Sequence, residues 1–126
     1  MKLRIKGNSM RLRISPSEMK DLLQSGRIEE TIYFGAEEGA HLTYALEVGA
    51  GLGPMTVRYR PQEVTVLISS REAQGWAEGG DVGLYGTAPS SRGPLEIAVE
   101  KDFACLDKDE RQNADTFPNP KQNAVC

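Results

Sequence analysis

Lys-Leu-Arg-Ile-Lys-Gly-Asn-Ser-Met-Arg-Leu-Arg-Ile-Ser, residues 2–15, is the stretch of sequence that decides the fold. Within it, apolar and basic residues alternate on both sides of the pair Gly7-Asn8. Alternation with a period of two is typical of β-strands, and Gly-Asn between two such runs is typical of a two-residue hairpin turn. The stretch therefore predicts a β-hairpin with one apolar face and one basic face.

The predicted register of this hairpin places like charges opposite one another. With the turn at Gly-Asn, Arg4 lies opposite Arg11 and Lys2 lies opposite Arg13, while the other face carries apolar pairs. Like charges directly opposite in a sheet destabilise it by about 0.2–1 kcal/mol per pair. We therefore expect an offsetting group, either carboxylates on a neighbouring strand or a bound anion.

Composition limits the classes of protein that this chain can represent. A chain of 126 residues with 39% hydrophobic and 26% charged residues fits one soluble globular domain. The net charge of −3 argues against a general nucleic-acid binder, although the first fifteen residues hold five basic and no acidic side chains. No apolar run is long enough to span a membrane, and no signal-peptide pattern stands at the start, so we expect a cytoplasmic protein.

Two short helices are predicted. Ser15 fits a helix N-cap, Pro16 the first helical position and Glu18 the partner residue of a capping box, which predicts a helix over 16–24. A second short helix is predicted over 70–78, with Ser70 as its cap. Trp76 in this segment is interpreted as an anchor that closes a sheet edge, with a contact to a partner as the alternative.

Further strand patterns follow the hairpin, separated by turn residues. They cover 28–34, 41–48, 55–60, 64–69, 82–85 and 95–103, with a loop at 86–94. Their spacing leaves little room for helical crossovers. We therefore predict an α+β domain built on a curled, mainly antiparallel sheet or partly open barrel of about seven to eight strands, with one or two short helices.

The end of the chain differs in composition from the rest. Residues 107–126 are polar and contain two prolines and three asparagines. We predict a single domain over 1–106 followed by an extended tail over 107–126, held to the domain by Phe117 and Pro118.

Parity along the strands gathers most of the basic side chains on the non-core face. We expect these residues to form an anion-binding concavity, in which arginine binds phosphate or carboxylate in bidentate fashion. The alternative is a solvated face that is kept soluble by Arg–Glu pairs across strands. The candidate residues are Lys2, Arg4, Lys6, Arg11, Arg13, Arg58 and Arg60, together with the acidic Glu96 and Glu100.

This alternation resembles the lining of the triphosphate-tunnel hydrolases, whose antiparallel barrels carry Glu, Lys and Arg on their inner walls. Those enzymes begin with a Glu-x-Glu-x-Lys strand that binds metal. Here the first strand is Lys2-x-Arg4-x-Lys6, so the metal-binding half of that motif is missing.

Other chemistry is weakly indicated. The residues of the types that zinc prefers do not have the spacing of a zinc finger or a zinc ribbon. The one histidine and two cysteines form no recognisable catalytic Cys–His pair, even with Lys101 as a possible partner of the thiolate. A buried Cys105 or a Cys105–Cys126 disulfide are the structural alternatives. We therefore assign no metal and no cofactor. The residues considered are His41, Cys105, Asp115 and Cys126.

Two segments carry a family resemblance. The N-terminal hairpin, together with Glu-Lys-Asp-Phe-Ala-Cys-Leu at 100–106 and Asp-Thr-Phe-Pro-Asn-Pro at 115–120, resembles a family of small uncharacterised bacterial proteins. The resemblance implies one domain over nearly the whole chain and supplies no activity. It directs attention to Arg4, Asn8, Arg11, Arg13, Glu100, Lys101, Asp102 and Cys105.

The sequence favours a non-catalytic binding module that holds an anionic small molecule or an acidic partner on the basic face of the hairpin. The first alternative is an enzyme acting on a phosphorylated or carboxylated substrate, with Glu96 or Glu100 as general base. The second is a structural or oligomeric protein in which the hairpin edge and Trp76 contact another chain, including a second copy of this one.

Overall fold

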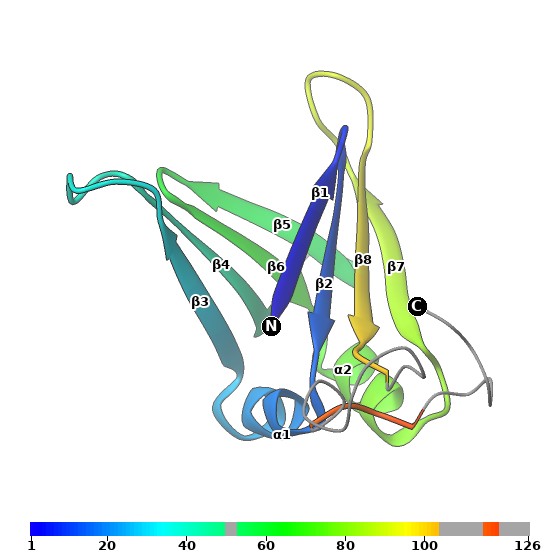
Figure 1. Ribbon diagram of the computed structural model, residues 1–126. Helices are drawn as coiled ribbons and strands as arrows, with labels where there is room; N and C mark the ends of the chain where they lie inside the picture. The colour runs from blue at the N-terminus through cyan, green and yellow to red at the C-terminus, as the bar shows by residue number, and fades with distance from the viewer. Residues whose placement is uncertain (50–52, 104–114, 119–126) are drawn as a thin grey trace.

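The computed structural model describes residues 1–49, 53–103 and 115–118. This part of the chain forms eight strands and two short helices (Figure 1). In chain order they are β1 (Lys2–Lys6), β2 (Ser9–Ile14), α1 (Pro16–Ser25), β3 (Arg27–Tyr33), β4 (His41–Val48), β5 (Met55–Arg60), β6 (Glu63–Ile68), α2 (Ser70–Glu78), β7 (Gly83–Ala88) and β8 (Leu95–Lys101).

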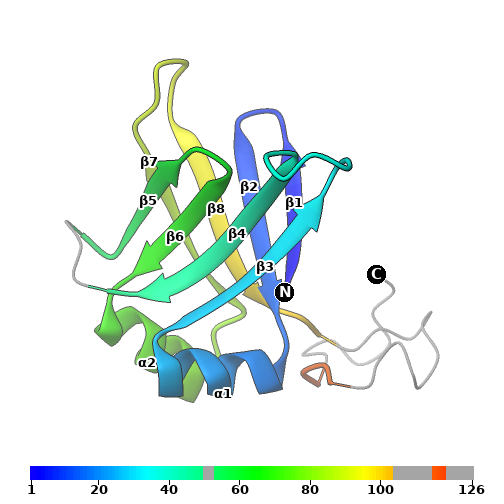
Figure 2. The same ribbon diagram turned by 90° about the vertical axis from the view of Figure 1, so that its left-hand side faces the viewer.

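The strands form two four-stranded sheets. Sheet A has the order β1-β2-β8-β7, and sheet B has the order β3-β4-β6-β5. The pairs β2–β8 and β4–β6 are parallel and the other four are antiparallel. The two sheets face each other as a wedge, with α1 and α2 across its narrow end (Figures 1 and 2). The α+β class with mainly antiparallel pairing is confirmed, and the described strands form no closed barrel.

The N-terminal hairpin has the predicted register. Lys2 pairs with Arg13 and Arg4 pairs with Arg11 across β1 and β2. The turn needs a residue in the left-handed region, and Gly7 supplies it with φ of 54°. The hairpin is therefore fixed by local sequence, and its basic face is a consequence of that register.

The core lies between the inner faces of the two sheets and is closed by the helices. Trp76 on α2 is 1% exposed, and its indole Nε1 donates to the carbonyl of Val82 at 3.4 Å, which confirms its role as an anchor. At the β5–β7 side, a Cβ at Gly86 would stand 3.3 Å from Sδ of Met55, so the absence of a side chain lets the sheets approach. The largest fully buried side chains are Leu12, Ile14, Leu22, Leu46, Thr65, Val66, Ile68, Trp76 and Val99.

The two helices begin as local sequence dictates, with one correction. Ser15 caps α1, and both hydrogen bonds of the predicted capping box with Glu18 are present. Helix α2 is capped by Ser69, not Ser70, because Ser69 has the extended backbone of a cap and its Oγ accepts from the amide of Glu72 at 3.1 Å. Ser70 is the first helical residue.

Strand β7 is longer than predicted. The sequence predicts that this strand ends at Tyr85 and that a loop begins at residue 86. In the structure, pairing with β8 continues through Gly86 and Thr87 to Ala88, which lies opposite Leu95. The partner strand supplies backbone hydrogen bonds that extend the strand through Gly86 and Ala88, whose β-propensity is low.

A short described segment near the end of the chain packs back on the body. The Phe117 ring lies edge-on to Phe103 with centroids 6.0 Å apart, and its amide donates to the carbonyl of Asp102 at 2.7 Å. Pro118 is exposed, so Phe117 alone of the predicted pair makes this contact. The rest of the predicted tail lies outside the described residues. No helix among them is long and apolar enough to cross a membrane.

Candidate functional site

The register of sheet A arranges the side chains of its outer face in three rows that cross all four strands. Each row takes one residue from β1, β2, β8 and β7 in that order. The first row is Lys6, Ser9, Glu96 and Thr87; the second is Arg4, Arg11, Ala98 and Tyr85; the third is Lys2, Arg13, Glu100 and Gly83.

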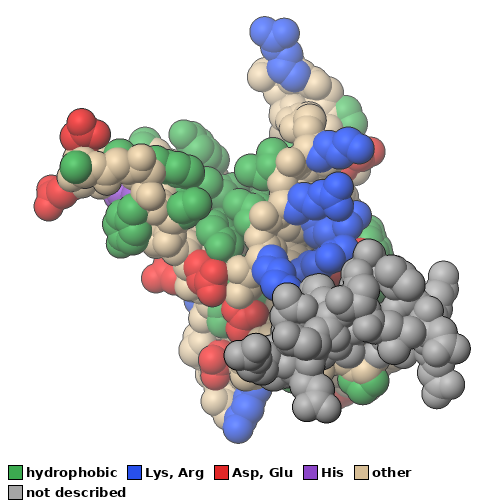
Figure 3. Space-filling view, viewed as in Figure 1, with side chains coloured by type: hydrophobic (Ala, Val, Ile, Leu, Met, Phe, Trp, Pro, Cys, Tyr) green, Lys and Arg blue, Asp and Glu red, His purple; other side chains and the backbone are tan. Residues whose placement is uncertain are grey.

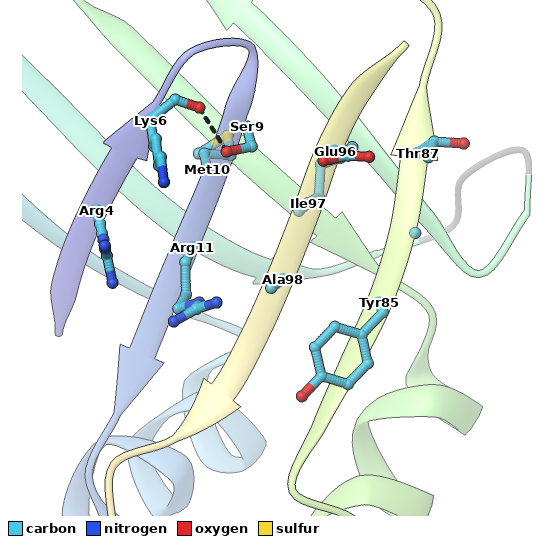
Figure 4. A pocket seen from close by; sticks show the side chains of 11 residues that line it. Arg4, Lys6, Ser9, Met10, Arg11, Tyr85, Thr87, Glu96, Ile97 and Ala98 are labelled. Carbon is cyan, nitrogen blue, oxygen red and sulfur yellow. Dashed lines mark hydrogen bonds between the residues drawn. The ribbon is translucent and has the colours of Figure 1, made fainter. Parts of the chain in front are cut away.

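The first two rows line a cavity of about 590 Å³ on this outer face (Figure 4). Arg4 and Arg11 stand on one side of it, Tyr85 stands on the other, and Ala98 lies between them. The small Ala98 side chain leaves a hollow between two large ones. The volume lies in the range typical of small-molecule sites, about 300–1,000 Å³.

Three basic side chains on this face, Arg11 in the second row and Lys2 and Arg13 in the third, lie beside carboxylates. Oε1 of Glu100 lies 3.1 Å from Nε of Arg11 and 3.6 Å from Nε of Arg13. Nζ of Lys2 donates to Asp102 at 2.7 Å. The expectation that carboxylates on a neighbouring strand offset the like charges of the hairpin is therefore confirmed for Arg11 and Arg13, which lie beside Glu100 on β8, while Lys2 pairs with Asp102 just after β8.

Two basic residues that line the cavity, which we call the groove, have no such carboxylate beside them in the described part of the chain. Arg4 and Lys6 are exposed and make no ion pair within the described residues. Arg4 nevertheless lies directly opposite Arg11 in the register. Figure 3 shows Lys and Arg side chains gathered in a column along sheet A. This half of the groove therefore presents positive charge without a complementary protein group.

Tyr85 is one of the groove residues that the sequence did not predict, as are Thr87 and Ala98. Its ring is 62% exposed, and its hydroxyl donates to Oε2 of Glu100 at 2.7 Å. Partial burial and the neighbouring Glu100 carboxylate raise the pKa of Tyr85, so the hydroxyl stays protonated as a donor. Alternation along the strand would have placed it on the outer face, but only the pairing with β8 brings it to the basic residues.

The structure does not bring Arg58 and Arg60 to this groove. Both lie on β5, on the outer face of sheet B, which points away from sheet A. Arg58 stands 3.4 Å from Glu47 and 3.9 Å from Glu63. The expectation of one concavity holding all nine candidates is corrected, because the strands divide into two sheets instead of curling as one.

The model of one protein family, described as Family of unknown function (DUF7009), matches residues 1–121. The chain belongs to this family. The expected resemblance to a family without an assigned activity is thereby confirmed. No curated protein and no solved structure matches the chain.

In this DUF7009 member, Asn8 joins the hairpin turn to the loop before β8. Its amide Nδ2 donates to Oγ of Ser90 at 3.2 Å and to the carbonyl of Pro94 at 3.1 Å. The backbone amide of Glu96 donates to the carbonyl of Asn8 at 3.1 Å. These bonds fix the end of the groove at which Lys6 and Glu96 lie.

Of the residues considered for a metal, the two that the structure describes, His41 and Asp115, make contacts with different parts of the fold. Nδ1 of His41 lies 2.7 Å from the carbonyl of Glu38, while Asp115 accepts from Oγ of Ser17 at 2.7 Å. Within the described ranges, no group of three or more His, Cys, Asp or Glu side chains is placed to hold a metal ion. Cys105 and Cys126 lie outside those ranges.

The structure bears on three further hypotheses drawn from the sequence. Lys101, considered as a thiolate partner, is 8% exposed and donates to the carbonyl of Gly79 at 3.0 Å, at the end of α2. The described strands enclose no tunnel of the kind that the triphosphate-tunnel hydrolases have, because the basic rows lie on the outer face of an open sheet. Glu100, considered as a general base, is engaged by Arg11, Arg13 and Tyr85.

Proposed function

We propose that this protein binds a small anionic ligand in the groove on the outer face of sheet A. The observation that supports this most strongly is that Arg4 and Lys6 line a cavity of about 590 Å³ without an ion pair in the described part of the chain. Arginine donates two parallel hydrogen bonds to phosphate or carboxylate. A bound anion would also relieve the repulsion between Arg4 and Arg11.

The charges favour a small ligand over a long polyanion. The unpaired cations occupy one side of one cavity, and the chain as a whole carries a net charge of −3. Glu96 also lines the groove and has no ion pair among the described residues. A polyanion that extended from Lys6 across the strands would meet this carboxylate, whereas a phosphate-sized group beside Arg4 and Lys6 would not.

The test is a comparison of two arginines in matched settings. Arg4 lies on β1 and Arg60 on β5; both are exposed, both belong to an outer face of an edge strand, and neither has an ion pair in the described ranges. Pyrophosphate is titrated calorimetrically into the wild type, Arg4→Gln and Arg60→Gln. We expect Arg4→Gln to weaken binding at least about ten-fold, the loss of one charge-assisted hydrogen bond, and Arg60→Gln to leave it unchanged.

Thermal unfolding gives an independent readout. Pyrophosphate at about 100 times its dissociation constant should stabilise the wild type by about 2.7 kcal/mol, a shift of several degrees. Without ligand, Arg4→Gln should be up to about 1 kcal/mol more stable than the wild type, because it removes a like-charge pair. Equal binding by Arg4→Gln and the wild type, or no shift with pyrophosphate, would contradict the proposal.

A further inference from the structure

The two sides of the groove differ in chemistry. On β1 and β2 it presents Arg4, Lys6 and Arg11, all cationic. On β7 and β8 it presents an aromatic ring, a small apolar surface and two oxygen-bearing side chains. These are Tyr85, Ala98, Thr87 and Glu96.

Arg4 and Lys6 on β1 lie too far from Tyr85 on β7 for an inorganic anion to touch both. Arg4 and Tyr85 belong to the same row but to strands separated by two others, β2 and β8. Neighbouring strands lie about 4.8 Å apart, so the two backbones are about 14 Å apart along the sheet. A ligand that fills the groove must therefore be longer than a phosphate and must carry different groups at its two ends.

Tyr85 is positioned as a stacking surface. Its ring is 62% exposed, while its hydroxyl is held by Glu100 at 2.7 Å, so the ring is restrained without being covered. Next to it in the row stands Ala98, which lies in the cavity and contributes only a methyl group (Figure 4). A planar ring has room to lie over Ala98 and against Tyr85, the usual mode of base recognition by aromatic side chains.

Hydrogen-bond acceptors stand beside this surface. Glu96 and Thr87 are paired in the register one row away from Tyr85, and both line the cavity. Neither side chain has a hydrogen-bond partner in the described ranges. The Glu96 carboxylate accepts only, so it is suited to an amino or hydroxyl group of a ligand.

Resting on the proposed function, we infer that the ligand is a phosphate ester that carries a planar, nitrogen-rich ring, such as a nucleoside monophosphate. The phosphate lies beside Arg4 and Lys6, the ring stacks on Tyr85 over Ala98, and a ring or sugar donor reaches Glu96. The phosphate would pair with Arg4 and Lys6, the ring would cover the exposed Tyr85, and the donor would bond Glu96, which has no side-chain partner in the described residues.

The test isolates the ring from the phosphate. Adenosine 5′-monophosphate and ribose 5-phosphate both contain a sugar and a phosphate ester, and only the first carries a base. Both are titrated into the wild type, Tyr85→Leu, Tyr85→Phe and the control Tyr59→Leu. Tyr59 is likewise exposed, at 74%, but lies on β5 of sheet B. We expect the wild type to bind the nucleotide at least about ten-fold more tightly than the ring-free ester. Tyr85→Leu should remove this preference and leave ribose 5-phosphate binding unchanged, while Tyr85→Phe and Tyr59→Leu should retain it.

A second variant probes the same hollow from its floor. Ala98→Leu fills the space between Arg11 and Tyr85, so it should also abolish the preference for the nucleotide while ribose 5-phosphate still binds. Equal affinity of the wild type for the two esters, or a preference that survives Tyr85→Leu and Ala98→Leu, would overturn this inference and leave the anion site intact. Failure of both esters and of pyrophosphate to bind would instead overturn the proposed function, and the inference with it.

Discussion

Single residues of the same type have different roles on this surface because their neighbours differ. Arg11 and Arg4 are direct cross-strand partners on the hairpin, yet Arg11 stands 3.1 Å from Glu100 and Arg4 has no ion pair within the described residues. The difference arises because β2 lies next to β8, whereas β1 is the edge strand. Position in the sheet therefore decides which arginine is neutralised and which stays available to a ligand.

Removing the Glu100 charge should move stability and anion binding in opposite directions. In Glu100→Gln, Arg11 and Arg13 lose their carboxylate, so we expect the free energy of unfolding to fall by about 1 kcal/mol. The groove gains positive charge, so pyrophosphate should bind a few-fold more tightly. Urea unfolding and calorimetry measure the two effects. Glu96→Gln on the same strand is the control for stability, because Glu96 has no ion pair in the described part and its loss should change stability by less than about 0.5 kcal/mol.

At the scale of helices and strands, a capping hydrogen bond determines where a helix begins. The adjacent serines Ser69 and Ser70 at the start of α2 allow this to be tested. Ser69 Oγ accepts the Glu72 amide at 3.1 Å, whereas Ser70 is the first helical residue. Ser69→Ala should therefore lower the free energy of unfolding by about 1 kcal/mol, the usual value of an N-cap. Ser70→Ala should change it by less than about 0.5 kcal/mol, because alanine is favoured inside helices. Equal losses from the two variants, measured by urea unfolding, would refute the assignment of the cap.

At the scale of the whole molecule, each sheet has an outer face with its own charge pattern. On sheet B, Glu47 lies between Arg27 and Arg58, and Nη1 of Arg27 is 2.9 Å from Oε1 of Glu47. The two arginine side chains cover Thr65, which is fully buried and accepts a hydrogen bond from Arg27. On sheet A, Arg4 and Lys6 of β1 line the groove and make no ion pair within the described residues. Because the chain forms two sheets, a closed ionic network and an open basic groove exist on opposite sides of one core.

The network on sheet B should make folding sensitive to acid. Burial alone would raise the pKa of Glu47, but hydrogen bonds from Arg27 and Arg58 outweigh it and lower the pKa below the ordinary 4.5. A carboxylate with a lowered pKa stabilises the fold above its unfolded-state value, and this stability is lost as the pH falls through the folded-state value. At pH 7, Glu47→Gln should be about 1–2 kcal/mol less stable than the wild type, and the gap should narrow below about pH 4.5.

Urea unfolding of both proteins at pH 7 and at acidic pH measures this gap. Glu38→Gln is the matched control, since the Glu38 side chain is exposed and makes no ion pair in the described part of the chain. A gap that is constant with pH, or one of equal size in Glu38→Gln, would show that Glu47 is not held charged by its arginines.

The sequence alone determined the features that depend on near neighbours along the chain. The register of the hairpin follows from the turn at Gly7-Asn8, and the start of α1 follows from Ser15 and Glu18. The face on which each strand residue lies follows from the alternation of side chains. These features are local, because turn geometry, capping bonds and parity involve residues only a few positions apart.

Only the tertiary structure decided which strands become neighbours. Arg11 and Tyr85 line the same cavity because β2 and β7 both pair with β8, and Arg58 is excluded because β5 joins the other sheet. Nothing in the local pattern of any strand specifies these partners. Their choice depends on how the apolar faces of all the strands bury one another around Trp76 and the rest of the core, and that is a property of the whole chain.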